Sequence, residues 1–97
     1  MDRNLDFLNT LEDIIDDRIG NSHENSYVKS LVDGGLDRIL KKIGEEAGEV
    51  IIAAKNNSRP ELLNESADLI FHLLIVLKSS GYSINDVVSV LADRHDS

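Results

Sequence analysis

The chain has 97 residues, 41% of them hydrophobic and 29% charged, which fits one globular domain over residues 1–97. Its net charge of −8 argues against a nucleic-acid partner, because such proteins need a basic surface. The absence of cysteine excludes a disulfide scaffold, a thiol nucleophile and a cysteine-based zinc site.

Apolar residues recur at helical spacing from the start of the chain. They run through Leu5–Ile19, and Gly20 ends this first predicted helix. Residues 20–25 are polar and predict a loop. Ser26 then caps a short helix that reaches Leu31 and is closed by two glycines.

Two long helices follow, joined by a short connection. The first covers residues 36–56. Ser58 and Glu61 predict a capping box at the start of the second, which ends near Ser80. Ser83 caps a last helix, and the final three residues are predicted to fray.

The short connection predicts that the two long helices pack as an antiparallel hairpin. The second is apolar almost all round over Leu69–Leu77, so it needs cover on every side, and a second subunit is the simplest cover. We therefore expect an all-α antiparallel helical bundle whose core is completed across a homodimer. The apolar stretch is too short for a membrane span, and the N-terminus shows no signal-peptide pattern. The expected protein is cytoplasmic, with no membrane partner.

The chemistry is carried by five carboxylates on the hairpin. Glu45, Glu46 and Glu49 lie within an arc of roughly 100° on one helix, and Glu65 and Asp68 share a face of the other. In an antiparallel pair the two groups stand level. Like charges so placed repel, and a divalent cation reverses the sign of the interaction. Oxygen ligands without His or Cys favour Mg²⁺, with Mn²⁺ as the alternative.

Other polar side chains flank these acids. Lys42 and Arg38 lie one and two turns before them on the same arc, and Asn56 continues that arc beyond them. Arginine and lysine are common phosphate ligands. His72 follows Asp68 by four residues, so it can hydrogen-bond to that residue behind a metal site.

Ordinary structural roles also account for each pattern taken alone. The acids fit a solvated helix face, Lys42 and Glu46 fit an i,i+4 ion pair, and His72 fits a satisfied core histidine. The level placement of the second acid pair, in an otherwise apolar helix, favours the metal site.

Three stretches of the sequence carry a family resemblance. Glu45-Glu46-x-x-Glu49 followed by Glu65-x-x-Asp68 resembles the metal motif of the MazG-like all-α nucleoside-triphosphate pyrophosphatases. The contexts Lys-Lys-Ile-Gly-Glu-Glu and Asp-Leu-Ile-Phe-His-Leu, with Ser-Tyr-Val-Lys-Ser-Leu upstream, resemble the phosphoribosyl-ATP pyrophosphohydrolase family. Many members of that family are fused to a cyclohydrolase domain, for which 97 residues leave no room, so the stand-alone form is expected. The resemblance covers about residues 5–95. One departure is Phe71, where the family usually has tyrosine.

The resemblance implies the second step of histidine biosynthesis, in which phosphoribosyl-ATP and water give phosphoribosyl-AMP and pyrophosphate. It implies Mg²⁺-assisted attack of water at the α–β phosphate junction. The implied metal ligands are the five acids, with Glu46 and Glu65 catalytic and Glu65 either a ligand or the group that orients water. The implied phosphate contacts are Arg38, Lys42 and Lys29, and the implied groups behind the ligands are His72 and Asn56.

Two other functions fit the same residues. A housekeeping pyrophosphatase acting on ordinary or damaged nucleotides would use the same acids, so the metal motif does not separate it from the first. A non-catalytic helical dimerisation module would carry the acids as surface charge only.

Overall fold

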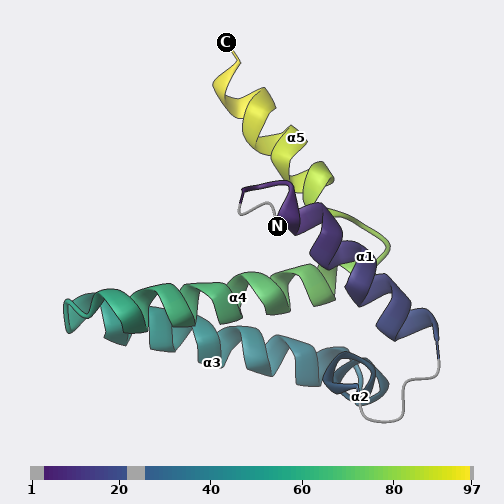
Figure 1. Cartoon of the computed structure of the whole chain (residues 1–97), viewed down its shortest axis with the longest axis horizontal. Helices are drawn as coiled ribbons and strands as arrows, with labels where there is room; N and C mark the ends of the chain where they lie inside the picture. The colour runs from purple at the N-terminus through teal and green to yellow at the C-terminus, as the bar shows by residue number, and fades with distance from the viewer. Residues whose placement is uncertain (1–3, 22–25, 97) are drawn as a thin grey trace.

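Five α-helices make up the part of the chain that the computed structural model describes, residues 4–21 and 26–96 (Figure 1). They are α1 (Phe7–Gly20), α2 (Tyr27–Asp33), α3 (Leu36–Lys55), α4 (Arg59–Ser79) and α5 (Ile84–His95). These described residues contain no β-strand, which confirms the predicted all-α class.

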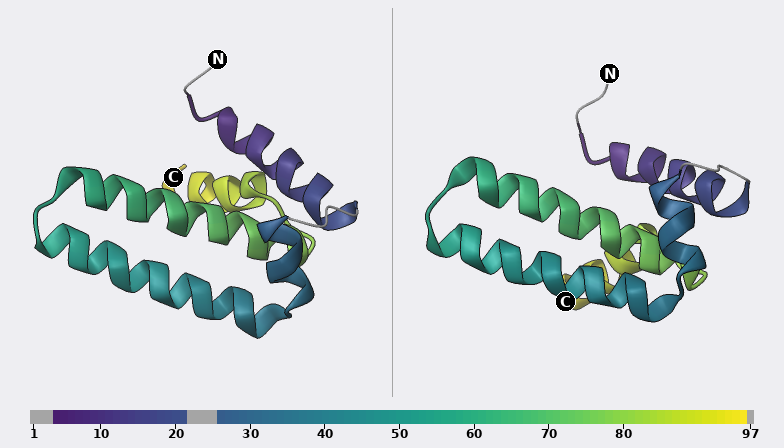
Figure 2. Two further views of the ribbon diagram at one scale, coloured as in Figure 1. Left: turned by 60° about the horizontal axis from the view of Figure 1, so that its bottom comes forward. Right: turned by 90° about the horizontal axis from the view of Figure 1, so that it is seen from below.

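The long helices α3 and α4 lie side by side as an antiparallel hairpin (Figures 1 and 2). At the open end of this hairpin α2 crosses the start of α3, and α1 packs against the end of α4. The core therefore sits where four helices meet, away from the hairpin connection. Its fully or nearly fully buried members are Ile15, Val28, Leu31, Ile39, Leu74 and Ile75.

Two of the predicted N-caps are confirmed. The Ser26 hydroxyl accepts the Lys29 N–H at 3.2 Å and starts α2. Ser83 and Asp86 form a reciprocal capping box at the start of α5. Each cap satisfies an N–H group that has no partner inside its own helix.

The predicted capping box at the start of α4 is half wrong. The Ser58 hydroxyl does accept the Glu61 N–H, at 3.4 Å. The Ser58 N–H, however, donates to the Ala53 carbonyl at 3.3 Å instead of to the Glu61 carboxylate. The tight turn out of α3 has already supplied that partner, so the Glu61 carboxylate does not cap α4.

Helix ends differ slightly from the predicted ones. Helix α1 begins at Phe7, which leaves Leu5 outside it and 82% exposed. Helix α5 extends to His95, so the predicted frayed tail is shorter than three residues. Residues 22–25 of the predicted loop lie outside the described residues.

A buried carboxylate fixes α5 to α1. Glu12 is only 4% exposed, and its Oε2 accepts the N–H of Ile84, the first residue of α5, at 2.7 Å. Asn85 adds a side-chain hydrogen bond to Asn9 at 3.0 Å. The rest of α5 projects away from the hairpin (Figure 1).

The single chain leaves much apolar surface uncovered. Its radius of gyration is 14.7 Å, whereas a compact chain of this length has about 12.5 Å. Ile70 and Leu73 on α4 are 42% and 40% exposed, and α5 has no buried residue within the described chain. Among the described helices none is by itself long and apolar enough to cross a membrane, although α4 and α5 together, bent by 104°, meet the test of length and composition.

Candidate active site

Three carboxylates converge midway along the hairpin. Glu46 and Glu49 lie on one face of α3, and Glu65 reaches them from α4. One oxygen from each lies within 4.8 Å of the other two. The antiparallel packing predicted from the sequence thus brings acids from both helices together.

Two oxygens of this cluster lack partners. Glu46 Oε2 and Glu65 Oε2 are buried and make no hydrogen bond within residues 4–21 and 26–96. Glu46 as a whole is only 6% exposed. A buried carboxylate oxygen without a partner is costly, so these two atoms are available to a cation.

The neighbouring acids raise the pKa of Glu65. A hydrogen bond with Glu49 is the main cause that raises the Glu65 pKa from 4.5 to about 7, followed by burial and by the charges of Glu49, Glu46 and Asp68. Glu65 therefore keeps a proton to higher pH than an ordinary glutamate does. The donor set contains only carboxylate oxygens, which fits Mg²⁺ or Mn²⁺.

The other two predicted ligands lie outside this close group. Glu45 is half exposed and faces Lys42, whose Nζ is 3.8 Å from its Oε1. Asp68 is exposed, yet near enough for its charge to raise the Glu65 pKa. Both remain predicted ligands.

Of the three predicted phosphate contacts, only Lys42 touches the cluster, with its Nζ 3.5 Å from Glu46 Oε1. Burial lowers the Lys42 pKa, but the Tyr27 hydroxyl and the Glu46 carboxylate outweigh it, so the pKa is raised. Lys42 is therefore a cation throughout the neutral range.

The other two predicted phosphate contacts lie near α2. Lys29 pairs with Asp33 at 3.2 Å on that helix. The Arg38 side chain lies against the α2–α3 turn. It is so close to Gly34 that a Cβ atom at that position would lie 2.6 Å from the Arg38 Cδ. Asn56 is the exposed C-cap of α3, beyond the acids. The structure does not bring these three residues to the cluster.

His72 binds Asp68 differently from the prediction. Its Nδ1 lies 2.7 Å from the backbone carbonyl oxygen of Asp68, not from the carboxylate. Helix geometry explains the difference, because a side chain points back toward the carbonyl four residues earlier. Nδ1 therefore carries the hydrogen, and Nε2 accepts the Tyr27 hydroxyl at 2.7 Å.

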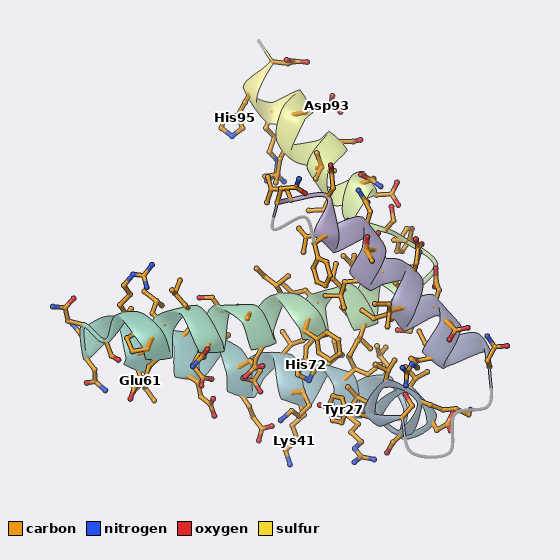
Figure 3. The ribbon with its side chains drawn as sticks, in the orientation of Figure 1. Tyr27, Lys41, Glu61, His72, Asp93 and His95 are labelled. Carbon is orange, nitrogen blue, oxygen red and sulfur yellow. The ribbon has the colours of Figure 1, made fainter. Side chains whose placement is uncertain are left out.

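Tyr27 is a site neighbour that sequence reasoning missed. Its ring makes an edge contact with His72 at 5.7 Å and stacks near Phe71 at 6.4 Å. Figure 3 shows Tyr27 and His72 close together where α2 meets the hairpin. The partners lie 45 residues apart, so no local pattern signals the pair.

Comparison with known proteins assigns the chain to a family. The phosphoribosyl-ATP pyrophosphohydrolase family matches residues 8–95. The chain belongs to this family. The matched range contains every predicted site residue and confirms the resemblance found in the sequence.

Individual relatives are similar over most of the chain. A phosphoribosyl-ATP pyrophosphatase of Leptospira biflexa is 50% identical over 91 residues, covering 94% of this chain and 99% of the relative. A phosphoribosyl-ATP pyrophosphatase of Streptococcus thermophilus is 51% identical over 78 residues, covering 80% of this chain and 75% of the relative. The bifunctional histidine biosynthesis protein HisIE of Thermus thermophilus is 53% identical over 81 residues, which cover 84% of this chain but 38% of that protein.

Proposed function

We propose that this chain hydrolyses phosphoribosyl-ATP to phosphoribosyl-AMP and pyrophosphate, as the names of its relatives indicate for them. Water adds to the α-phosphorus, and the bond from that phosphorus to the bridging oxygen of the β-phosphate breaks. The supporting observation is the convergence of Glu46, Glu49 and Glu65 with two buried oxygens that have no partner within the described residues.

These three residues would hold a divalent cation, with Asp68 and Glu45 as the remaining predicted ligands. When bound, Mg²⁺ supplies positive charge to the triphosphate and to the leaving pyrophosphate. Glu65 serves either as a ligand or as the carboxylate that orients the attacking water. Both roles need its anion, which the raised pKa makes scarce below neutral pH in the metal-free protein.

Lys42 binds the leaving pyrophosphate. It is the cation in contact with the acid cluster, and it stays protonated. Arg38 and Lys29, at the same end of the hairpin, would meet outer phosphate oxygens after side-chain movement. The predicted cytoplasmic location stays a prediction.

We also propose that two copies form a homodimer. The exposed apolar residues of α4 and α5 and the large radius of gyration support it, because a second copy would cover these faces. Sedimentation equilibrium at micromolar concentration should give twice the mass of 10.7 kDa. A folded monomer would contradict this assembly.

The substrate assignment is tested by comparing kcat/KM for phosphoribosyl-ATP, ATP and dCTP with Mg²⁺. Phosphoribosyl-ATP should be far the best substrate. Equal or better turnover of an ordinary nucleotide would favour the housekeeping pyrophosphatase, and no pyrophosphate release at all would favour the dimerisation module.

A further inference from the structure

A cavity adjoins the acid cluster on the side of the hairpin connection. Its volume is about 240 Å³, and it lies between the last turns of α3 and the first turns of α4. Ligand sites usually enclose about 300–1,000 Å³, so this cavity suits one part of a nucleotide. Its lining residues are Glu49, Ile52, Ala53, Glu61 and Glu65.

Glu61 is the unexplained member of this lining. It does not cap α4, since the Ser58 N–H is bonded to Ala53. Its carboxylate makes no ion pair or hydrogen bond with residues of the described segments. Figure 3 shows Glu61 near the connection end of the hairpin, far from Tyr27 and His72. An exposed acid in the first turn of α4, without an ion pair or hydrogen bond from its carboxylate within the described residues, thus borders a cavity that also has an apolar wall.

The order of groups along α3 assigns a direction to the substrate. Lys42 lies about 10 Å along the helix before Glu49, and Ala53 lies about 6 Å beyond it. This direction rests on the proposed function, in which the leaving pyrophosphate faces Lys42 and the cleaved bond lies at the acid cluster. The nucleoside then extends from the α-phosphate toward the cavity.

The base of this substrate differs from the base of ATP in charge. In phosphoribosyl-ATP the second ribose is attached to N1 of adenine. Substitution at N1 makes the ring a much stronger base, which is protonated near neutral pH. ATP carries a neutral adenine under the same conditions.

We propose that the cavity receives this cationic adenine and that Glu61 is a specificity-determining residue for its charge. Ile52 is 61% exposed and offers an apolar surface on which a flat ring can lie, and Ala53, which is 2% exposed, closes the wall behind it. Glu49 and Glu65 are engaged by the cation site, which leaves Glu61 to face the base. A neutral adenine fits the same surface but gains no ion pair.

The test separates base recognition from catalysis by using two uncleavable nucleotides. The α,β-methylene analogues of ATP and of 1-methyl-ATP differ only by the N1 methyl group and its charge. Calorimetric titration of the full chain with Mg²⁺ at pH 7 should show the 1-methyl analogue binding about fivefold tighter, the size expected of a partly exposed ion pair. Glu61→Gln should remove most of that preference and leave the Kd of the ATP analogue unchanged.

Asp37→Asn is the matched control, because Asp37 is an exposed acid in the first turn of the other hairpin helix. Asp37→Asn should retain the full preference for the 1-methyl analogue. Glu61→Asp, which keeps the charge on a shorter side chain, should retain part of it. Equal binding of the two analogues by the unaltered protein would overturn the inference, and so would a preference that survives in Glu61→Gln. A failure of the proposed function would instead appear as no pyrophosphate release from phosphoribosyl-ATP.

Discussion

The Tyr27 hydroxyl donates a hydrogen bond of 2.7 Å to Nε2 of His72 and thereby joins α2 to α4. His72 is 5% exposed, and its other nitrogen is already bonded to the Asp68 carbonyl. Removing the hydroxyl leaves a buried acceptor without a partner. Tyr27→Phe should therefore lower the free energy of unfolding by about 1–2 kcal/mol in urea titrations.

The chain offers its own control for this substitution. Tyr82 is 59% exposed and makes no side-chain hydrogen bond within the described residues, so Tyr82→Phe should leave stability nearly unchanged. Equal effects of the two substitutions would show that the Tyr27–His72 bond does not stabilise the fold.

Glu12 should govern the attachment of α5. Its buried carboxylate is the acceptor for the Ile84 N–H, so Glu12→Ala leaves that donor unpaired at a helix start. We expect a loss of about 1.5–3 kcal/mol and faster hydrogen exchange at the Ile84 amide. Asp13→Ala, at the exposed neighbouring position, is the control, and unchanged exchange in Glu12→Ala would refute the cap.

The titration of Glu65 predicts how the metal-free protein responds to pH. Its pKa is about 7 in the fold, mainly through the hydrogen bond with Glu49, against 4.5 as the ordinary value. The fold therefore binds this proton more tightly than the unfolded chain does. The resulting stabilisation is complete below pH 4.5 and is lost as the pH rises toward about 7.

Urea unfolding in EDTA across this range measures the effect. Glu65→Gln imitates the protonated side chain, so it should remove this part of the pH dependence and be more stable than the unaltered protein at pH 8. Asp93→Asn, on the exposed face of α5, should leave the dependence unchanged. An equal slope in Glu65→Gln would show that the proton is bound elsewhere.

Glu49 should affect stability and activity in opposite directions. Without metal its charge adds to the repulsion in the cluster, so Glu49→Gln should raise the Tm in EDTA by about 2 °C. Turnover should fall sharply, because a neutral amide is a poor Mg²⁺ ligand. A lower Tm with near-full turnover would mean that Glu49 has a structural role instead.

Helices and caps were predictable because their signals are local. The spacing of Ile39 and Ile43, and the Ser83–Asp86 pair, act within a few residues. The hairpin followed from the short connection and placed Glu49 level with the acids of α4. That step predicted a group of five acids, of which the structure brings Glu46, Glu49 and Glu65 within 4.8 Å of one another.

The remaining site features depend on contacts between distant segments. Tyr27 meets His72 across 45 residues, and Glu12 meets Ile84 across 72. The free carboxylate of Glu61 depends on the turn geometry that bonds the Ser58 N–H to Ala53. Periodicity and spacing carry no information on such tertiary contacts.

We expect the carboxylates of the α3–α4 hairpin to bind the cation required to cleave phosphoribosyl-ATP. Pyrophosphate release from this substrate, measured against Mg²⁺ concentration for the unaltered protein and for Glu46→Gln, tests it most directly. We expect no release in EDTA, saturable activation by Mg²⁺, and a loss of activity in Glu46→Gln larger than the roughly 10–100-fold typical of groups behind metal ligands. Full turnover in EDTA, or near-normal activation of folded Glu46→Gln, would contradict it.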